Sequence, residues 1–188
     1  PNVHYQLACA DGRVIEASSP SQIPTDVRIQ AFREPVVKTN LIVPPTYIGA
    51  IMTFVQERRG KYLRTEYLGS ERVSLYFDIP LAEIIYDFYD KLKSITRGYG
   101  TMDYDRPRYA EEALVRLDVL VAGQPVDALS CVVYRPEAHR RGRELLQKIR
   151  KEISKHLFEV VLQAAVGGKI IARESIKPMA KHVTAKCY

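Results

Sequence analysis

The chain has 188 residues, a mass of 21.4 kDa and a formal net charge of +6. With 46% hydrophobic and 27% charged residues it can bury a core, which excludes wholesale disorder. No apolar run approaches the roughly 18 residues of a membrane-spanning helix, and three scattered cysteines exclude a disulfide scaffold, so we expect a reducing compartment.

Residues 1–33 are interpreted as the tail of a preceding domain. Residues 3–17 alternate weakly around Asp11-Gly12, a dipeptide that predicts a hairpin turn. Residues 18–24 then hold three Ser and two Pro, which is typical of a loop. This piece is too short to bury a core of its own. No signal peptide opens the sequence and there is no initiator Met, so we expect a processed chain or a piece of a longer protein.

Residues 34–106 are predicted to form a ferredoxin-like domain. Apolar periodicity switches between strand and helix in the order βαββαβ. The first helix begins near Pro45 and is expected to end at Gly60 as its C-cap; the second begins at Pro80 and ends at Gly98. The predicted strands and helices are 36–43, 48–59, 62–68, 72–79, 81–95 and 99–104.

Residues 107–188 are predicted to form a second small α+β domain, with antiparallel strands around a basic helix. A hairpin is expected over 115–121 and 126–134. Pro136 starts a helix whose apolar face carries Leu145, Leu146, Ile149 and Ile153. Strands over 158–166 and 169–173 should pair around Gly167-Gly168.

Positive charge is confined to the second half of the sequence. Residues 1–106 hold 13 basic and 13 acidic side chains, whereas residues 107–188 hold 15 and 9. Between residues 135 and 188 there are 13 basic and 5 acidic side chains. Because Arg forks onto phosphate oxygens and one helix presents several cations at once, this imbalance favours RNA or another polyanion as partner. A solvated helix face is the alternative.

The candidate phosphate contacts follow from that imbalance. They are Arg135, Arg140, Arg141, Arg143, Lys148, Lys169, Arg173, Lys177, Lys181 and Lys186. A secondary set is Arg58, Arg59 and Arg97, whose places at helix ends offer another explanation. Four interleaved rings could stack on bases: Tyr134, His139, His156 and Tyr188.

No catalytic residue or metal site is predicted. The sequence has no phosphate-loop, dinucleotide-binding or nucleophile-elbow motif, and its four His lie far apart in sequence. An acylphosphatase-like activity on a ferredoxin-like fold needs a phosphate cradle with an Arg, but Pro44-Pro45-Thr46 offers few free N–H donors and no Arg. A small ferredoxin-like enzyme and a regulatory protein-binding module remain the alternatives.

Several motifs resemble the LepA-type translational GTPases, the elongation factor 4 family. Those that resemble the fifth domain of translational GTPases are Glu34-Pro35, Tyr47-Ile48-Gly49-Ala50, Gln56-Glu57-Arg58-Arg59-Gly60, Ile79-Pro80-Leu81-Ala82-Glu83 and Arg97-Gly98-Tyr99. Those that resemble the LepA-type factors in particular are Val126-Asp127-Ala128-Leu129-Ser130, Arg141-Gly142-Arg143, Gln163-Ala164-Ala165, Lys169-Ile170-Ile171-Ala172-Arg173-Glu174 and Ala185-Lys186-Cys187-Tyr188.

The resemblance implies a ribosome-dependent parent GTPase, which uses GTP and magnesium and acts on elongating ribosomes in back-translocation, translation fidelity or ribosome function. This chain would be its C-terminal part, contacting the ribosome, ribosomal RNA and tRNA as a monomer. It would have no cofactor and no enzymatic activity, because the GTP-binding domain is missing. The family continues past Tyr188 into a basic tail, so we expect a chain cut at both ends. The implied location is cytoplasmic, peripheral at the inner face of the cell membrane, or an organellar matrix.

Overall fold

The computed structural model describes residues 3–156 and 158–179. They form two compact units, and each is described by itself. The first unit holds residues 3–18 and 29–112, and the second holds 19–28 and 113–179. Residues 19–28 thus pack with the second unit, although they precede the first unit's strand at residue 29. The domain limits 1–33, 34–106 and 107–188 stay a prediction.

The long strand β3 (Ile29–Val43) organises the first unit. Its first half pairs with β1 (Tyr5–Cys9), which pairs in turn with β2 (Val14–Ala17). The hairpin expected around Asp11-Gly12 is therefore present, and Gly12 takes φ +88° at its turn. The predicted strand 36–43 is confirmed but begins earlier, because the hairpin supplies partners for residues 29–33.

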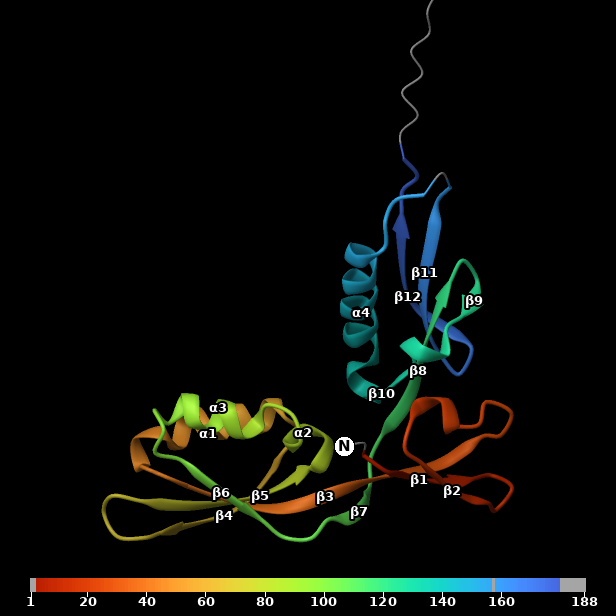
Figure 1. Cartoon of the computed structure of the whole chain (residues 1–188). Coiled ribbons are helices and arrows are strands. Elements are labelled where there is room, and N and C mark those ends of the chain that lie inside the picture. The colour runs from red at the N-terminus through yellow and green to blue at the C-terminus, as the bar shows by residue number, and fades with distance from the viewer. Residues whose placement is uncertain (1–2, 157, 180–188) are drawn as a thin grey trace, which may run out of the picture. The chain divides into compact units, whose positions relative to one another are not determined.

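The second half of β3 lies in a four-stranded antiparallel sheet of order β4-β5-β3-β6. Three helices cover one face of this sheet (Figure 1), which confirms the ferredoxin-like βαββαβ order. The further elements of the unit are the 3₁₀ turn η2 Pro45–Tyr47, α1 Ile48–Glu57, β4 Lys61–Tyr67, β5 Val73–Pro80, α2 Leu81–Ile84, α3 Phe88–Ile95, β6 Thr101–Tyr104 and β7 Arg108–Glu111.

The predicted single helix 81–95 is wrong in one respect: it is divided into α2 and α3. Arg58 occupies the break, where its Nη1 donates to the Glu83 carbonyl oxygen at 3.3 Å and lies 2.9 Å from Oδ1 of Asp87. The Glu83 carbonyl thus bonds the side chain of the residue that caps the end of α1. The apolar period survives the break, since Ile84, Phe88 and Leu92 all reach the core.

Helices α1 and α3 end in the same way, with Arg followed by Gly. The Gly60 N–H donates to the Val55 carbonyl at 2.9 Å, and the Gly98 N–H donates to the Lys93 carbonyl at 2.7 Å. These six-to-one bonds define Schellman motifs, whose left-handed position is usually Gly. Here Arg59 and Arg97 take it, with φ of 58° and 52°. The expectation of Gly60 as the left-handed cap was therefore wrong by one residue.

The second unit is a five-stranded antiparallel sheet covered on one face by the helix α4 (Figure 1). Four strands follow the order β10-β8-β11-β12, and β9 pairs with β8. The expected return strand 126–134 is interrupted by a 3₁₀ turn. The elements are η1 Pro20–Gln22, β8 Leu114–Val121, β9 Gln124–Pro125, η3 Asp127–Leu129, β10 Cys131–Tyr134, η4 Arg135–Glu137, α4 Ala138–Glu152, β11 Val160–Val166 and β12 Lys169–Ile176.

Gly142 sets how closely α4 approaches its sheet. It is buried in the middle of the helix, and a Cβ added there would lie 3.2 Å from the Cβ of Ala164 and 3.7 Å from that of Ala172. Three small residues therefore meet where helix and sheet are closest. Leu146 packs beside them and is fully buried.

We expect Gly142→Leu to destabilise the second unit by about 1–3 kcal/mol, because the added side chain must push α4 off the sheet. Gly49→Leu is the matched control, since Gly49 is also helical but has no atom within 4 Å of an added Cβ. Chemical denaturation followed by far-ultraviolet circular dichroism compares the two. Equal effects of the two substitutions would contradict this role of Gly142.

Candidate nucleic-acid interface

Helix α4 separates an apolar face from a cationic one. Ala138, Gly142 and Leu146 are buried against the sheet, and Leu145, Ile149 and Ile153 pack partly beside them. This is the i, i+4, i+8 spacing of a helix that buries one stripe. Every Arg and Lys of the helix is solvent-exposed: Arg140, Arg141, Arg143, Lys148, Arg150 and Lys151.

Ion pairing divides these cations into two groups. Arg140 contacts Glu137 at 3.1 Å and Glu144 at 3.0 Å, and Arg150 contacts Glu174 of β12 at 2.9 Å. Among the described residues, no carboxylate forms an ion pair with Arg141, Arg143 or Lys148. These three predicted site residues therefore carry charge that nothing described in the chain neutralises.

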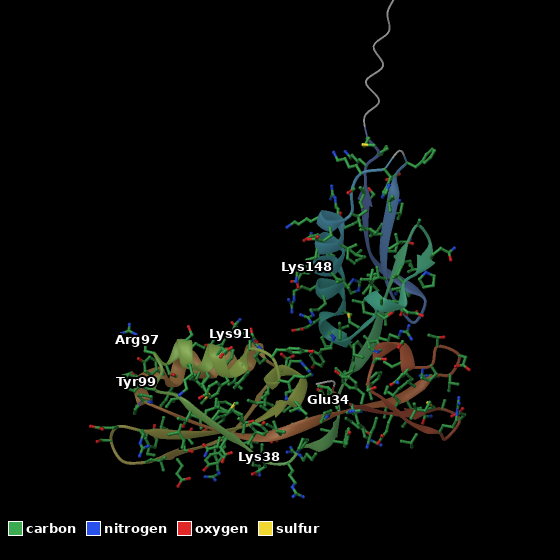
Figure 2. The ribbon with its side chains drawn as sticks, viewed as in Figure 1. Glu34, Lys38, Lys91, Arg97, Tyr99 and Lys148 are labelled. Carbon is green, nitrogen blue, oxygen red and sulfur yellow. The ribbon has the colours of Figure 1, made fainter. Side chains whose placement is uncertain are left out.

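The unpaired cations span the width of the helix. Arg141 and Lys148 are seven residues apart and so share one flank, whereas Arg143 shares the other with Arg150. Burial raises the pKa of the Cys131 thiol on β10, and the charge of Arg141 opposes that rise. Arg141 is therefore near β10, and the first flank lies toward that edge of the sheet. The second faces β12, where Arg150 meets Glu174. Figure 2 labels Lys148 on the outer side of α4.

The other predicted phosphate contacts are dispersed over the second unit. Arg135 is exposed in the turn before α4, and Lys169 is exposed at the start of β12. Arg173 is exposed too, but its neighbour Ala172 faces α4, so Arg173 lies on the opposite face of the sheet. Lys177 is exposed after β12. Lys181 and Lys186 lie outside the described residues.

The rings expected to interleave with these cations differ in exposure: His139 and His156 are exposed, whereas Tyr134 is not fully so. Tyr134 is half-buried at the end of β10, and Nδ1 of His139 lies 3.2 Å from the Ile171 carbonyl oxygen. His156 is exposed after α4. Tyr188 lies outside the described residues. Of the four rings, only His139 lies on α4 itself, next to Arg140 and one helical turn before Arg143.

Arg59 of the secondary set is held inside the first unit. Its guanidinium donates to both carboxylate oxygens of Glu34, at 2.6 and 3.1 Å, and its Nε donates to Glu83 at 3.2 Å. Glu34 is only 1% exposed. Burial alone lowers the pKa of Arg59, but the hydrogen bonds and charges of Glu34 and Glu83 outweigh it and raise that pKa. Together with the Arg58 contacts to α2 and α3, this makes both residues architectural.

The sequence reasoning missed Glu34 as a structural carboxylate. The available signal was an acidic residue within the strand-forming segment that leads into Val36 and Val37. Burial and, to a lesser extent, the charge of Glu34 together raise the pKa of Tyr5 to about 12, although the charge of Arg59 opposes the rise. Burial around Tyr5 and Glu34 disfavours negative charge, so the Glu34 carboxylate depends on the positive charge of Arg59 beside it.

Arg97, the third of the set, is exposed in the loop after α3, and no described carboxylate pairs with it. Tyr99, two residues on, is 72% exposed. The sequence reasoning passed over Tyr99, although the Arg-Gly-Tyr-Gly spacing was visible. Figure 2 shows both residues at the same end of the helical layer of this unit.

A metal site and a membrane-spanning helix are two further features that residues 3–156 and 158–179 could contain. In those residues no three His, Cys, Asp or Glu side chains gather in a way that could hold a metal ion. Nor is any helix there long and apolar enough to cross a membrane.

Comparison with known proteins follows the two-part division of the sequence. A family described as "Elongation factor G C-terminus" matches residues 31–120, and one described as "GTP-binding protein LepA C-terminus" matches residues 121–188. Relatives named elongation factor 4 from Symbiobacterium thermophilum and Desulfitobacterium hafniense are 50% and 45% identical over all 188 residues. The chain spans 31% of the length of either relative.

A ferredoxin-like unit of the elongation factor G type, followed by a unit with an exposed cationic helix, defines the C-terminal region of a translation elongation factor. The chain belongs to the LepA family, also called elongation factor 4, and corresponds to the C-terminal part of its members.

We expect Arg59→Met to destabilise the first unit by about 3–5 kcal/mol, because it leaves Glu34 as an unpaired buried carboxylate. The double variant Glu34→Gln with Arg59→Met should recover much of that loss, since the amide carries no charge. Thermal unfolding of wild type and variants measures both effects. An Arg59→Met chain as stable as wild type would show that the pair is not what fixes this helix end.

Proposed function

We propose that this chain is the ribosome-binding C-terminal part of a ribosome-dependent GTPase, and that α4 contacts ribosomal RNA and tRNA. The observation that carries the proposal is the outer face of α4, where Arg141, Arg143 and Lys148 are exposed without ion pairs to described carboxylates. The relatives named elongation factor 4 support the setting.

The alternative, a helix face that serves only solubility, fits this surface less well. Helix faces that only meet water usually interleave signs, because Glu and Lys four residues apart stabilise the helix. Here Arg140, Arg141 and Arg143 crowd one turn, and only Arg140 has described acidic partners. Such repulsion is relieved when phosphates approach, and a helix can align several cations along a phosphate backbone.

The remaining phosphate contacts extend this surface over the second unit. Arg135, Lys169 and Lys177 are exposed and belong to the proposal, and so do Lys181 and Lys186 beyond the described residues. Arg173 would have to meet RNA from the other face of the sheet. The proposal leaves out Arg58 and Arg59, because their guanidinium groups are bound within the first unit.

In the parent protein, GTP and magnesium would bind outside this chain, which we propose to be inactive as an enzyme. The parent would act on elongating ribosomes, in back-translocation, translation fidelity or ribosome function, as a cytoplasmic monomer. In this scheme the chain supplies positioning: contacts with ribosomal RNA and tRNA hold the factor while its GTPase part acts.

We expect the chain to bind purified bacterial ribosomes, with an affinity that falls by on the order of a hundredfold from 50 to 200 mM salt. Replacing Arg141, Arg143 and Lys148 together by Gln should weaken binding and reduce the slope of log affinity against log salt by up to about three. Sedimentation or filter binding at several salt concentrations measures the slope.

The control variant replaces Lys38, Arg72 and Arg106 by Gln, three exposed cations of the first unit without described ion-pair partners. It changes the net charge equally, so its slope should stay near that of wild type. Equal slopes for the two triple variants would mean that α4 contributes only net charge. No wild-type affinity at low salt would refute ribosome binding by this chain.

A further inference from the structure

Two helix ends in the first unit share a hydrogen-bond pattern but differ in what their arginines do. Arg59 and Arg97 both take the left-handed position of a Schellman motif, with φ of 58° and 52°, and a Gly follows each. Gly adopts this conformation without steric strain, whereas a residue with a Cβ does not. Each arginine therefore needs a reason to be there.

For Arg59 the reason lies inside the chain. Its side chain is 17% exposed and binds the buried carboxylate of Glu34. For Arg97 no comparable reason is visible among the described residues, because its side chain is exposed and makes no ion pair with any of their carboxylates. An unusual backbone conformation that the local contacts do not explain points to a function outside the chain.

The loop that carries Arg97 is held at both ends. The Thr96 hydroxyl is fully buried, donates to the Leu92 carbonyl oxygen at 2.8 Å and accepts the Gly100 N–H at 2.8 Å. Gly100 permits this closure, since a Cβ there would lie 2.7 Å from Oγ1 of Thr96. Nζ of Lys93 also donates to the Gly98 carbonyl oxygen at 3.3 Å. Residues 97–99 are thus presented from fixed points.

The exposed tip of this loop joins a cation to an aromatic ring. Arg97 is followed after one residue by Tyr99, 72% exposed, and Figure 2 shows the two at one end of the helical layer. An exposed aromatic ring can stack on a nucleotide base and so remove apolar area from water. A guanidinium group can donate two hydrogen bonds to a phosphate. Stacking by Tyr and phosphate binding by Arg is the usual chemistry for unpaired nucleotides.

We propose that the loop 96–100 is a second RNA contact of this chain, separate from α4, in which Arg97 binds a phosphate and Tyr99 stacks on an adjacent unpaired base. This inference rests on the proposed ribosome binding, and adds a site in the unit whose overall charge is balanced. Its ligand is a looped or single-stranded segment of ribosomal RNA, because a base inside a duplex offers no free face for stacking.

The decisive variant is Arg97→Gly, because it removes the guanidinium while keeping the left-handed backbone. We expect binding to purified bacterial ribosomes to weaken by about tenfold, with a salt slope lower by about one. The melting temperature should stay equal or rise, since Gly relieves the strain at this position. Arg72→Gln, which removes one exposed charge from the same unit, is the matched control.

Tyr99 is tested separately by Tyr99→Ala and Tyr99→Phe. Loss of the ring should weaken binding by about tenfold with the salt slope unchanged, whereas Phe should bind like wild type because it still stacks. Tyr86→Ala is the matched control, since Tyr86 lies in the same unit and is 78% exposed.

The outcomes separate this inference from the proposed function. If wild type binds ribosomes but Arg97→Gly binds as well as Arg72→Gln, the loop is not an RNA contact, although the chain still binds. If Arg97→Gly only lowers the melting temperature, Arg97 is structural. If wild type shows no affinity at low salt, ribosome binding fails and this inference falls with it.

Discussion

The buried carboxylate of Glu34 is the constraint on which the first unit depends. It lies on the central strand β3 at 1% exposure, where an unpaired negative charge would carry a large desolvation penalty. Arg59 satisfies it with two hydrogen bonds and also reaches Glu83 on α2. The end of α1 is therefore bound to the sheet and to the next helix, and Arg58 extends the link to the start of α3.

This arrangement explains why the helix end carries an arginine in the left-handed conformation. The position is fixed by the backbone, and only a long cationic side chain can reach Glu34 from it. The strain of that conformation is modest compared with the penalty of leaving a carboxylate buried and unpaired. The same motif recurs after α3 without an internal partner, and the comparison of the two distinguishes an architectural arginine from an exposed one.

Pairing, more than the number of charges, thus separates the cations of this chain by role. Arg58, Arg59, Arg140 and Arg150 are neutralised within the chain. Arg141, Arg143, Lys148 and Arg97 are exposed and have no ion pair to described carboxylates. A polyanion gains most from the second group, because meeting it breaks no existing ion pair.

The sequence by itself determined the βαββαβ order, the ferredoxin-like class, the basic helix and the family, because these depend on local periodicity, turn residues and contiguous motifs. It did not show the break between α2 and α3 or the 3₁₀ turn before β10. Only the tertiary structure decided that Arg59 is internal and Arg97 external, that Arg173 lies across the sheet from α4, and that residues 19–28 pack with the second unit. The reason is that burial and ion pairing join residues far apart in sequence: Glu34 and Arg59, or Arg150 and Glu174, are each more than twenty positions apart, and no local pattern records which charges meet.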